Sequence, residues 1–126
     1  MPTYIDGFLF PLNKQDLPQY QNIAEQVAAI WKEYGAIAYH EFVGDDLSLE
    51  GTRSFTEALT PNASEVIIFG WVLFPSKEIR DKANKAVPQD PRMTELVAPI
   101  MNPEKLIFDA SKMFYGGFKA LVELQE

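Results

Sequence analysis

Two ionisable side chains lie inside apolar, strand-like segments of this sequence. Asp6 is flanked by Ile5 and Gly7, and His40 lies within the segment 36–43. Burying a carboxylate costs free energy unless other groups hydrogen-bond it, and a buried carboxyl with a shifted pKa can act as an acid or a base. Histidine has an ordinary pKa near neutrality, which suits proton transfer. Asp6 and His40 are therefore the candidate catalytic residues.

Both residues also have a structural interpretation. Asp6 can cap a nearby loop, or pair with a basic group on the last strand, for which Lys119 is the candidate if the register brings the two to one face. His40 can be exposed to solvent, or lie in a seam between two copies of the chain. The sequence leaves these alternatives open.

A second polar set accompanies the predicted second helix. Arg80 and Asn84 are four residues apart and therefore lie on one helical face. Arg92 follows shortly after, and the three side chains together suit a carboxylate or phenolate ligand. The alternative for Arg92 is an ion pair with an acidic loop, such as the one containing Asp45 and Asp46.

Several aromatic residues predict a pocket between the sheet and the first helix. They are Trp31, Tyr34, Tyr39, Trp71 and Tyr115. A ligand site there would have a volume of roughly 300 Å³ or more and would take a small apolar or aromatic molecule. The alternative is that these rings only fill the core.

Composition excludes several kinds of chemistry. The 126 residues include no cysteine and a single histidine, which rules out disulfides, thiolate nucleophiles and clusters of metal-binding Cys or His. We predict no metal and no cofactor. Phosphate-binding G-x-x-x-x-G-K and nucleophile G-x-S-x-G patterns do not occur. The net charge of −7 and the scattered basic residues disfavour nucleic acid. No stretch reaches the roughly 20 apolar residues of a membrane span, and no secretion signal is recognisable, so we predict a cytoplasmic protein.

The elements that must position these residues follow from periodicity. The longest apolar run, 65–75, predicts a strand buried on both faces, and strands are also predicted at 3–12, 36–43 and 112–124. Apolar residues at helical spacing predict a helix from about residue 13 to Gly35, capped by Asn13 or Asp16, and another from Ser76 to Pro88. A short helix follows Asp90 and Pro91, and 45–64 is a long connection.

The resulting order, β-α-β-β-α-β, predicts one ferredoxin-like α+β domain over 1–126, with an antiparallel four-stranded sheet in the order fourth, first, third, second strand. Two helices cover one face of such a sheet. The other face is also apolar and would form a patch larger than monomers usually expose. We therefore predict a homodimer in which two sheets pack face to face.

Four stretches resemble a known family. They are Tyr4-Ile5-Asp6-Gly7-Phe8, Phe69-Gly70-Trp71-Val72-Leu73-Phe74-Pro75-Ser76, Asp90-Pro91-Arg92-Met93 and Met113-Phe114-Tyr115-Gly116-Gly117-Phe118. Together they resemble the YbaA-like family, a bacterial family of unknown function, over essentially the whole chain. The resemblance implies a dimeric α+β barrel. That superfamily includes cofactor-free monooxygenases, haem-degrading enzymes, isomerase-like proteins and stress-response barrels, and an activity is not transferred by fold alone.

Two functions from different classes fit the sequence. The first is a small-molecule binder or cofactor-independent enzyme with an aromatic pocket, in which Asp6, His40 or Arg92 supplies the polar contact. The second is a non-catalytic dimeric interaction or stress-response module with a closed core. Haem degradation is a weaker third option, because His40 would have to bind the iron from an edge strand.

Overall fold

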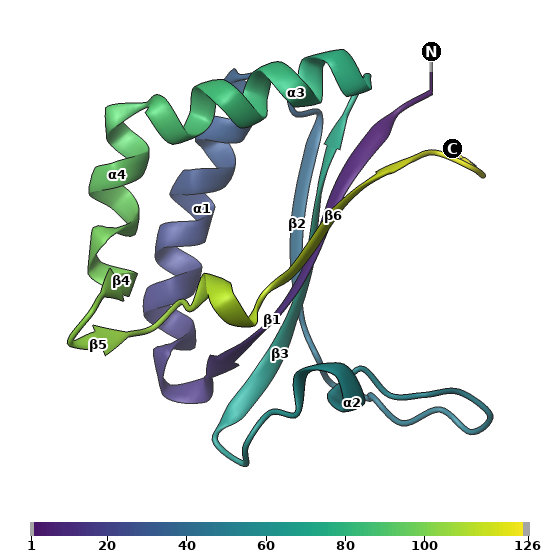
Figure 1. Cartoon of the computed structure of the whole chain (residues 1–126), viewed down its shortest axis with the longest axis vertical. Coiled ribbons are helices and arrows are strands. Elements are labelled where there is room, and N and C mark those ends of the chain that lie inside the picture. Colours follow the sequence, from purple (N-terminus) through teal and green to yellow (C-terminus); the bar gives the residue numbers. More distant parts are fainter. Residues whose placement is uncertain (1, 125–126) are drawn as a thin grey trace.

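Two long central strands, β1 and β3, form the middle of one antiparallel sheet. The computed structural model describes residues 2–124. Its helices and strands are β1 Tyr4–Asn13, α1 Leu17–Glu33, β2 Ala38–Val43, α2 Thr56–Leu59, β3 Glu65–Phe74, α3 Lys77–Ala86, α4 Pro91–Val97, β4 Met101–Asn102, β5 Lys105–Leu106 and β6 Phe114–Lys119. The sheet order is β2-β3-β1-β6, which confirms the predicted order and the ferredoxin-like fold. Figure 1 shows α1, α3 and α4 on one side of this sheet.

Local signals for the helix ends are confirmed. The Ser76 side chain accepts a hydrogen bond from the Ile79 amide at the start of α3, and Asp90 caps α4 in the same way through the Arg92 amide. Gly35 follows α1 with φ of 115°, a left-handed conformation that favours glycine. Asn13 caps a short 3₁₀ turn over Lys14–Asp16, so α1 itself begins later than predicted.

The last strand is shorter than predicted. Its first expected residue, Lys112, lies instead in a 3₁₀ turn that Asp109 caps. At the other end, Lys119 is opposite Tyr4, where β1 begins. Only one further bond, from the Ala120 amide to the Thr3 carbonyl, continues the pairing. The alternating pattern of residues 112–124 therefore extends beyond the strand that could pair with it.

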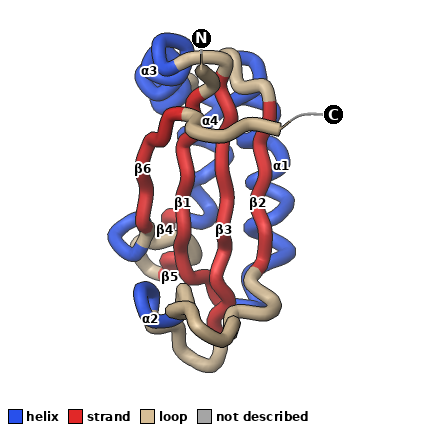
Figure 2. Tube along the Cα trace, turned by 90° about the vertical axis from the view of Figure 1, so that its right-hand side faces the viewer, coloured by secondary structure: helices blue, strands red, loops and turns tan. Residues whose placement is uncertain are grey.

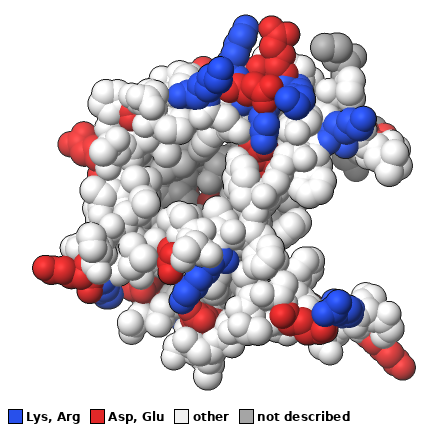
Figure 3. Space-filling model, in the orientation of Figure 1, with Lys and Arg blue, Asp and Glu red and all other residues white. Residues whose placement is uncertain are grey.

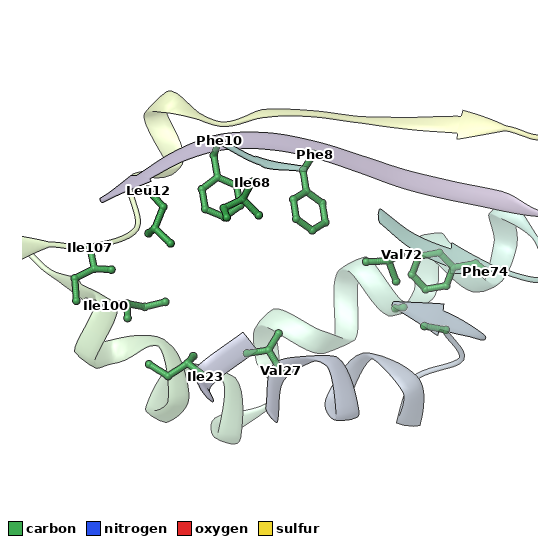
Figure 4. Packing of buried hydrophobic residues seen from close by; sticks show 12 residues of the cluster. Phe8, Phe10, Leu12, Ile23, Val27, Ile68, Val72, Phe74, Ile100 and Ile107 are labelled. Carbon is green, nitrogen blue, oxygen red and sulfur yellow. The ribbon is translucent and has the colours of Figure 1, made fainter. Parts of the chain in front are cut away.

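The inner face of the sheet carries the core. Strand alternation places Phe8, Phe10 and Leu12 of β1 beside Ile68, Val72 and Phe74 of β3, and these residues are buried. Figure 4 shows Phe8 and Phe10 pointing from the sheet toward the helical layer, and Ile23 and Val27 pointing back from α1.

The outer face of the sheet is apolar, and of the helices in residues 2–124 only the short α2 lies on that side, near one end of the strands (Figure 1). Figure 2 views this face, with all four strands in front of the helical layer. The cross-strand register places sixteen residues on it, of which Pro11, Asn13, Glu65 and Ile67 lie at the end where β3 begins. The other twelve are Ile5, Gly7, Leu9, Ala38, His40, Phe42, Phe69, Trp71, Leu73, Phe114, Gly116 and Phe118. We call this set the outer sheet face. Its exposed phenylalanines include Phe118, which is 62% exposed.

No helix in the described part of the chain is both long and apolar enough to cross a membrane.

Candidate functional site

Asp6 lies at the centre of a buried polar cluster that joins three elements. From β1 it faces the helical layer, and its side chain is 1% exposed. Arg80 of α3 donates from Nε to Oδ1 at 2.8 Å, and Asn84, one turn later, donates to Oδ2 at 3.3 Å. Tyr115 of β6 donates its phenol O–H to Oδ2 at 2.7 Å. We call Asp6, Arg80, Asn84 and Tyr115 the Asp6 cluster.

This cluster changes the expected partner of Asp6. The sequence pointed to Lys119, but Lys119 lies opposite Tyr4, two residues away along β1. The cation that contacts Asp6 is the guanidinium of Arg80, which donates a charge-assisted hydrogen bond to the carboxylate. Burial, followed by the hydrogen bond to Asp6, raises the pKa of Tyr115, so its phenol stays protonated and serves as a donor.

A pocket of about 210 Å³ lies between the sheet and the helical layer. Its lining is almost entirely apolar or aromatic and consists of Phe8, Tyr20, Ile23, Ala24, Val27, Trp31, Tyr39, Val72, Met93, Val97, Ile100, Met101, Phe108, Met113 and Tyr115. We call it the apolar pocket. It contains three of the five aromatic residues predicted from the sequence, and its volume is smaller than the expected 300 Å³.

The other two predicted aromatic residues are elsewhere. Trp71 projects from the outer sheet face, opposite His40, because it alternates with the inward-facing Val72. Its predicted place in a pocket on the helical side is therefore wrong. Tyr34, at the end of α1, donates its phenol O–H to Asp90 at 2.8 Å.

His40 lies on the opposite face of the sheet from Asp6. It is exposed, and its ring stacks on Phe42 and lies 5.3 Å from the Trp71 ring, centroid to centroid. Within one chain, a single bound molecule cannot contact both Asp6 and His40. The two candidate catalytic residues are thus not brought together.

Arg92 belongs to a separate ion-pair network. Its guanidinium donates to both carboxylate oxygens of Glu33 at 3.0 Å and to Asp90 at 2.8 Å, which ties α4 to the end of α1. The hydrogen bonds from Arg92 hold the pKa of Asp90 well below its ordinary value. The predicted grouping of Arg92 with Arg80 and Asn84 is therefore wrong, as is its predicted pairing with the acidic loop of Asp45 and Asp46.

Sequence reasoning missed a half-buried carboxylate on the edge strand β2. Glu41 accepts a hydrogen bond from Tyr20 of α1 at 2.5 Å on one oxygen and from Tyr39 at 2.7 Å on the other. Burial raises the pKa of Glu41, and raises the pKa of both phenols, which therefore stay protonated. Strand alternation could have indicated this position from the sequence, because Glu41 is two residues from Tyr39 and therefore lies on the same face of the strand.

Glu41 also lines a second cavity, of about 380 Å³, beside the edge of the sheet. Its lining consists of Leu17, Tyr20, Gln21, Ala24, Glu25, Ala28, Tyr39, Glu41, Phe42, Val43 and Ile68. We call it the edge pocket. It shares Tyr20, Ala24 and Tyr39 with the apolar pocket, whereas Glu41 lines the edge pocket alone. Figure 3 shows the molecule hollowed between the helices and the sheet, with mostly uncharged side chains around the hollow.

Residues 2–124 contain no group of three or more His, Cys, Asp or Glu side chains that could hold a metal ion. The polar chemistry described here is therefore that of carboxylates, phenols and a guanidinium.

Comparison with known proteins places the chain in a family and the fold among solved structures. Over 122 residues it is 34% identical to the uncharacterised protein YbaA of Escherichia coli, covering 95% of this chain and 97% of that protein. The structure is similar to that of a mutant of SnoaB, a cofactor-independent oxygenase from Streptomyces nogalater, with a TM-score of 0.60 and 10% identity over the full length of both chains. A dimeric ferredoxin-like protein from an uncultured marine organism has a TM-score of 0.53 and 11% identity, again over both full lengths.

At such low identities, the two solved structures establish the fold alone. The sequence match is stronger evidence, because a family model described as "Protein of unknown function (DUF1428)" matches residues 3–110. The chain therefore belongs to the DUF1428 family, together with YbaA.

Proposed function

We propose that this protein is a homodimer that binds a small, apolar, aromatic molecule between α1 and the inner face of its sheet. The observation that carries the proposal is the apolar pocket, a concave site lined by aromatic rings and methionines. Ligand sites typically combine an apolar lining with a few fixed polar groups. The phenols of Tyr39 and Tyr115 supply such groups here, since buried carboxylates hold both.

The size of the site supports a ligand of one or two rings. The apolar pocket is smaller than a typical drug-sized site, but the edge pocket continues it past Tyr20 and Tyr39. A ring system in the apolar pocket would leave a polar substituent directed toward the edge pocket. SnoaB, a cofactor-independent oxygenase, shares the fold, so the fold supports catalysis without a bound cofactor.

The outer sheet face supports the homodimer. Its contiguous apolar side chains, with four phenylalanines between 43% and 62% exposed, resemble one half of a buried interface rather than a monomer surface. A solved neighbour with this fold is described as dimeric. The cytoplasmic location remains a prediction from the sequence.

Ligand binding can be measured through Trp31, which lines the apolar pocket. In a Trp71→Phe variant Trp31 is the only tryptophan, and its fluorescence then reports on the pocket. We expect titration with α-naphthol to change this fluorescence in a saturable manner, with one site per chain.

Two variants of α1 test the location of this site. Ala24→Phe adds a ring where the two pockets adjoin and should weaken α-naphthol binding at least tenfold. Ala29→Phe adds the same ring at an exposed position of the same helix and should leave binding unchanged. Absence of saturable binding, or equal binding by the two variants, would overturn the proposed function.

A further inference from the structure

Glu41 is a half-buried carboxylate that forms no ion pair within residues 2–124. Among residues 2–124, the ion pairs join other residues, and none includes Glu41. This differs from Asp6, which has the same kind of inward-facing strand position but is paired with Arg80 at 2.8 Å. Only two neutral phenols satisfy Glu41. Burial favours the protonated form of Glu41 and the two phenol hydrogen bonds favour its carboxylate; burial has the larger effect, so the pKa of Glu41 is raised.

The surroundings of Glu41 suit a proton transfer with a bound molecule. Its carboxylate lines the edge pocket and accepts hydrogen bonds from Tyr20 and Tyr39, which line both cavities. A ligand that extends from the apolar pocket past these two phenols into the edge pocket would therefore reach it. The edge pocket connects the same carboxylate to solvent, which lets it exchange its proton. The titratable groups that share the edge pocket with Glu41 are Tyr20 and Glu25 of α1 and Tyr39 of its own strand.

We propose that Glu41 is a general base that removes a proton from carbon next to the carbonyl of an aromatic ketone held in the apolar pocket. This inference rests on the proposed ligand site. The C–H bond breaks, the proton moves to a Glu41 oxygen, and the electron pair moves onto the carbonyl oxygen to give an enolate. The carboxyl then returns a proton to the ligand, at the same carbon or at a conjugated one. The result is exchange or isomerisation, and no oxidant or cofactor is consumed.

Tyr20 and Tyr39 complete the step. In the resting state each phenol donates to Glu41. When Glu41 takes up the proton it loses its negative charge, and one phenol becomes free to donate to the enolate oxygen instead. Hydrogen-bond donors that are already in place where charge develops stabilise the transition state of such a reaction.

Deuterium exchange into β-tetralone, a two-ring ketone with acidic C–H bonds beside its carbonyl, tests this inference. In D₂O the protein should accelerate incorporation of deuterium, followed by mass spectrometry. Glu41→Gln keeps the size of the side chain but removes the base, and should slow the reaction about 100-fold or more, within the usual range for a general base. Glu104→Gln makes the same change at an exposed glutamate that lines neither pocket and should retain the rate.

The pH profile separates a catalytic role from a structural one. Because the base must be ionised, the rate should rise with pH and level off above the pKa of Glu41, which burial raises from its ordinary value. Glu41→Gln should abolish this dependence, and Glu41→Asp should retain it with a lower rate.

The outcomes distinguish the two proposals. Binding of β-tetralone, measured by Trp31 fluorescence, without accelerated exchange would overturn the role of Glu41 and leave the ligand site intact. Deuterium exchange that persists at the wild-type rate in a folded Glu41→Gln variant would likewise overturn the role of Glu41 and leave the ligand site intact. Failure of both β-tetralone and α-naphthol to bind would overturn both proposals.

Discussion

Asp6 is the most deeply buried charged residue in the described part of the chain. Its carboxylate is 1% exposed and accepts three hydrogen bonds, from Arg80, Asn84 and Tyr115. Removing one partner of a buried ion pair leaves the other charge uncompensated, which costs about 3–5 kcal/mol. The Asp6 cluster therefore joins α3 and β6 to the central strand β1, and we expect the loss of its ion pair to destabilise the fold strongly.

We expect Arg80→Met to lower the free energy of unfolding by about 3 kcal/mol, because Asp6 remains buried without its cation. Adding Asp6→Asn in the same chain should recover most of this loss, since the buried charge is then removed. Urea denaturation of the single and double variants measures both effects. The control is Arg53→Met, which breaks the exposed pair with Glu57 and should cost less than about 1 kcal/mol. Equal losses for the two arginine variants would contradict the role of the Asp6 cluster.

The sequence predicted the burial of Asp6 but not its partner. An aspartate between Ile5 and Gly7 on a central strand must be hydrogen-bonded, whatever supplies the donor. The donor Arg80 lies 74 residues along the chain, and the way α3 lies across the sheet decides which of its residues reaches β1. The sequence offered Lys119 only on the condition that the register brought it to the face of Asp6. The spacing of residues in the sequence does not predict where a helix lies above a sheet.

Glu41 was missed for a related reason. A charged residue on an edge strand usually faces solvent, so its position in the sequence does not mark Glu41 as a candidate. In the structure Tyr20 of α1 closes over it, so the residue is buried by an element outside its own strand.

At the scale of elements, Gly70 allows β3 to pack between its neighbours. It lies opposite Phe8 of β1 and Glu41 of β2. A Cβ atom at this position would be 2.5 Å from the Phe8 ring and 2.8 Å from the backbone carbonyl oxygen of His40. The Phe8 ring can move, but the carbonyl belongs to the sheet. The absence of a side chain at Gly70 thus leaves room for the buried Phe8 ring.

Gly70→Ala should destabilise the protein by about 1–3 kcal/mol, the usual cost of overpacking a core. Thermal or urea unfolding at matched protein concentration measures the change. Gly7→Ala adds the same methyl group to β1, where the nearest atom would be 3.8 Å away on the Phe118 ring. The Gly7→Ala variant should therefore have nearly the wild-type free energy of unfolding. If Gly70→Ala were as stable as Gly7→Ala, the packing argument would be contradicted.

Element types and order were predictable because each has a local signal. The capping residues Ser76 and Asp90 and the terminal Gly35 mark helix ends through contacts within a few residues of the chain. The end of β6 has no such signal. Leu121, Val122 and Leu124 continue the apolar pattern but are 84% to 96% exposed. The backbone pairing with the first strand ends before them, at the bond from the Ala120 amide to the Thr3 carbonyl.

At the scale of the whole molecule, the two faces of the sheet have different roles. The inner face carries the Asp6 cluster, Glu41 and the apolar pocket, whereas the outer sheet face carries aromatic and aliphatic side chains with His40 as its one ionisable group. The connection 44–64 adds to this surface, because the Phe55 ring lies 6.1 Å from that of Phe69. Such a division is expected if one face binds ligand and the other binds a second copy of the chain.

Phe118→Asp separates dissociation of the proposed dimer from unfolding. Phe118 is 62% exposed in the single chain, so a charge there meets water in the monomer but would be buried and unpaired between two sheets. We expect the wild-type protein to sediment at twice the 14.3 kDa chain mass at micromolar concentration, and the folded variant at the chain mass. Trp71→Asp should dissociate or unfold the protein, because Trp71 is only partly exposed and contacts neighbouring rings.

Leu106→Asp provides the matched control for this experiment. Leu106 is 48% exposed, but it belongs to the short β4–β5 hairpin beside the helices and lies outside the outer sheet face. The same substitution there should leave the dimer intact, because the new charge stays in solvent in either state. A wild-type protein at the chain mass would contradict the face-to-face dimer directly. Dissociation by Leu106→Asp but not by Phe118→Asp would place the interface on the helical side, where it would limit access to the apolar pocket.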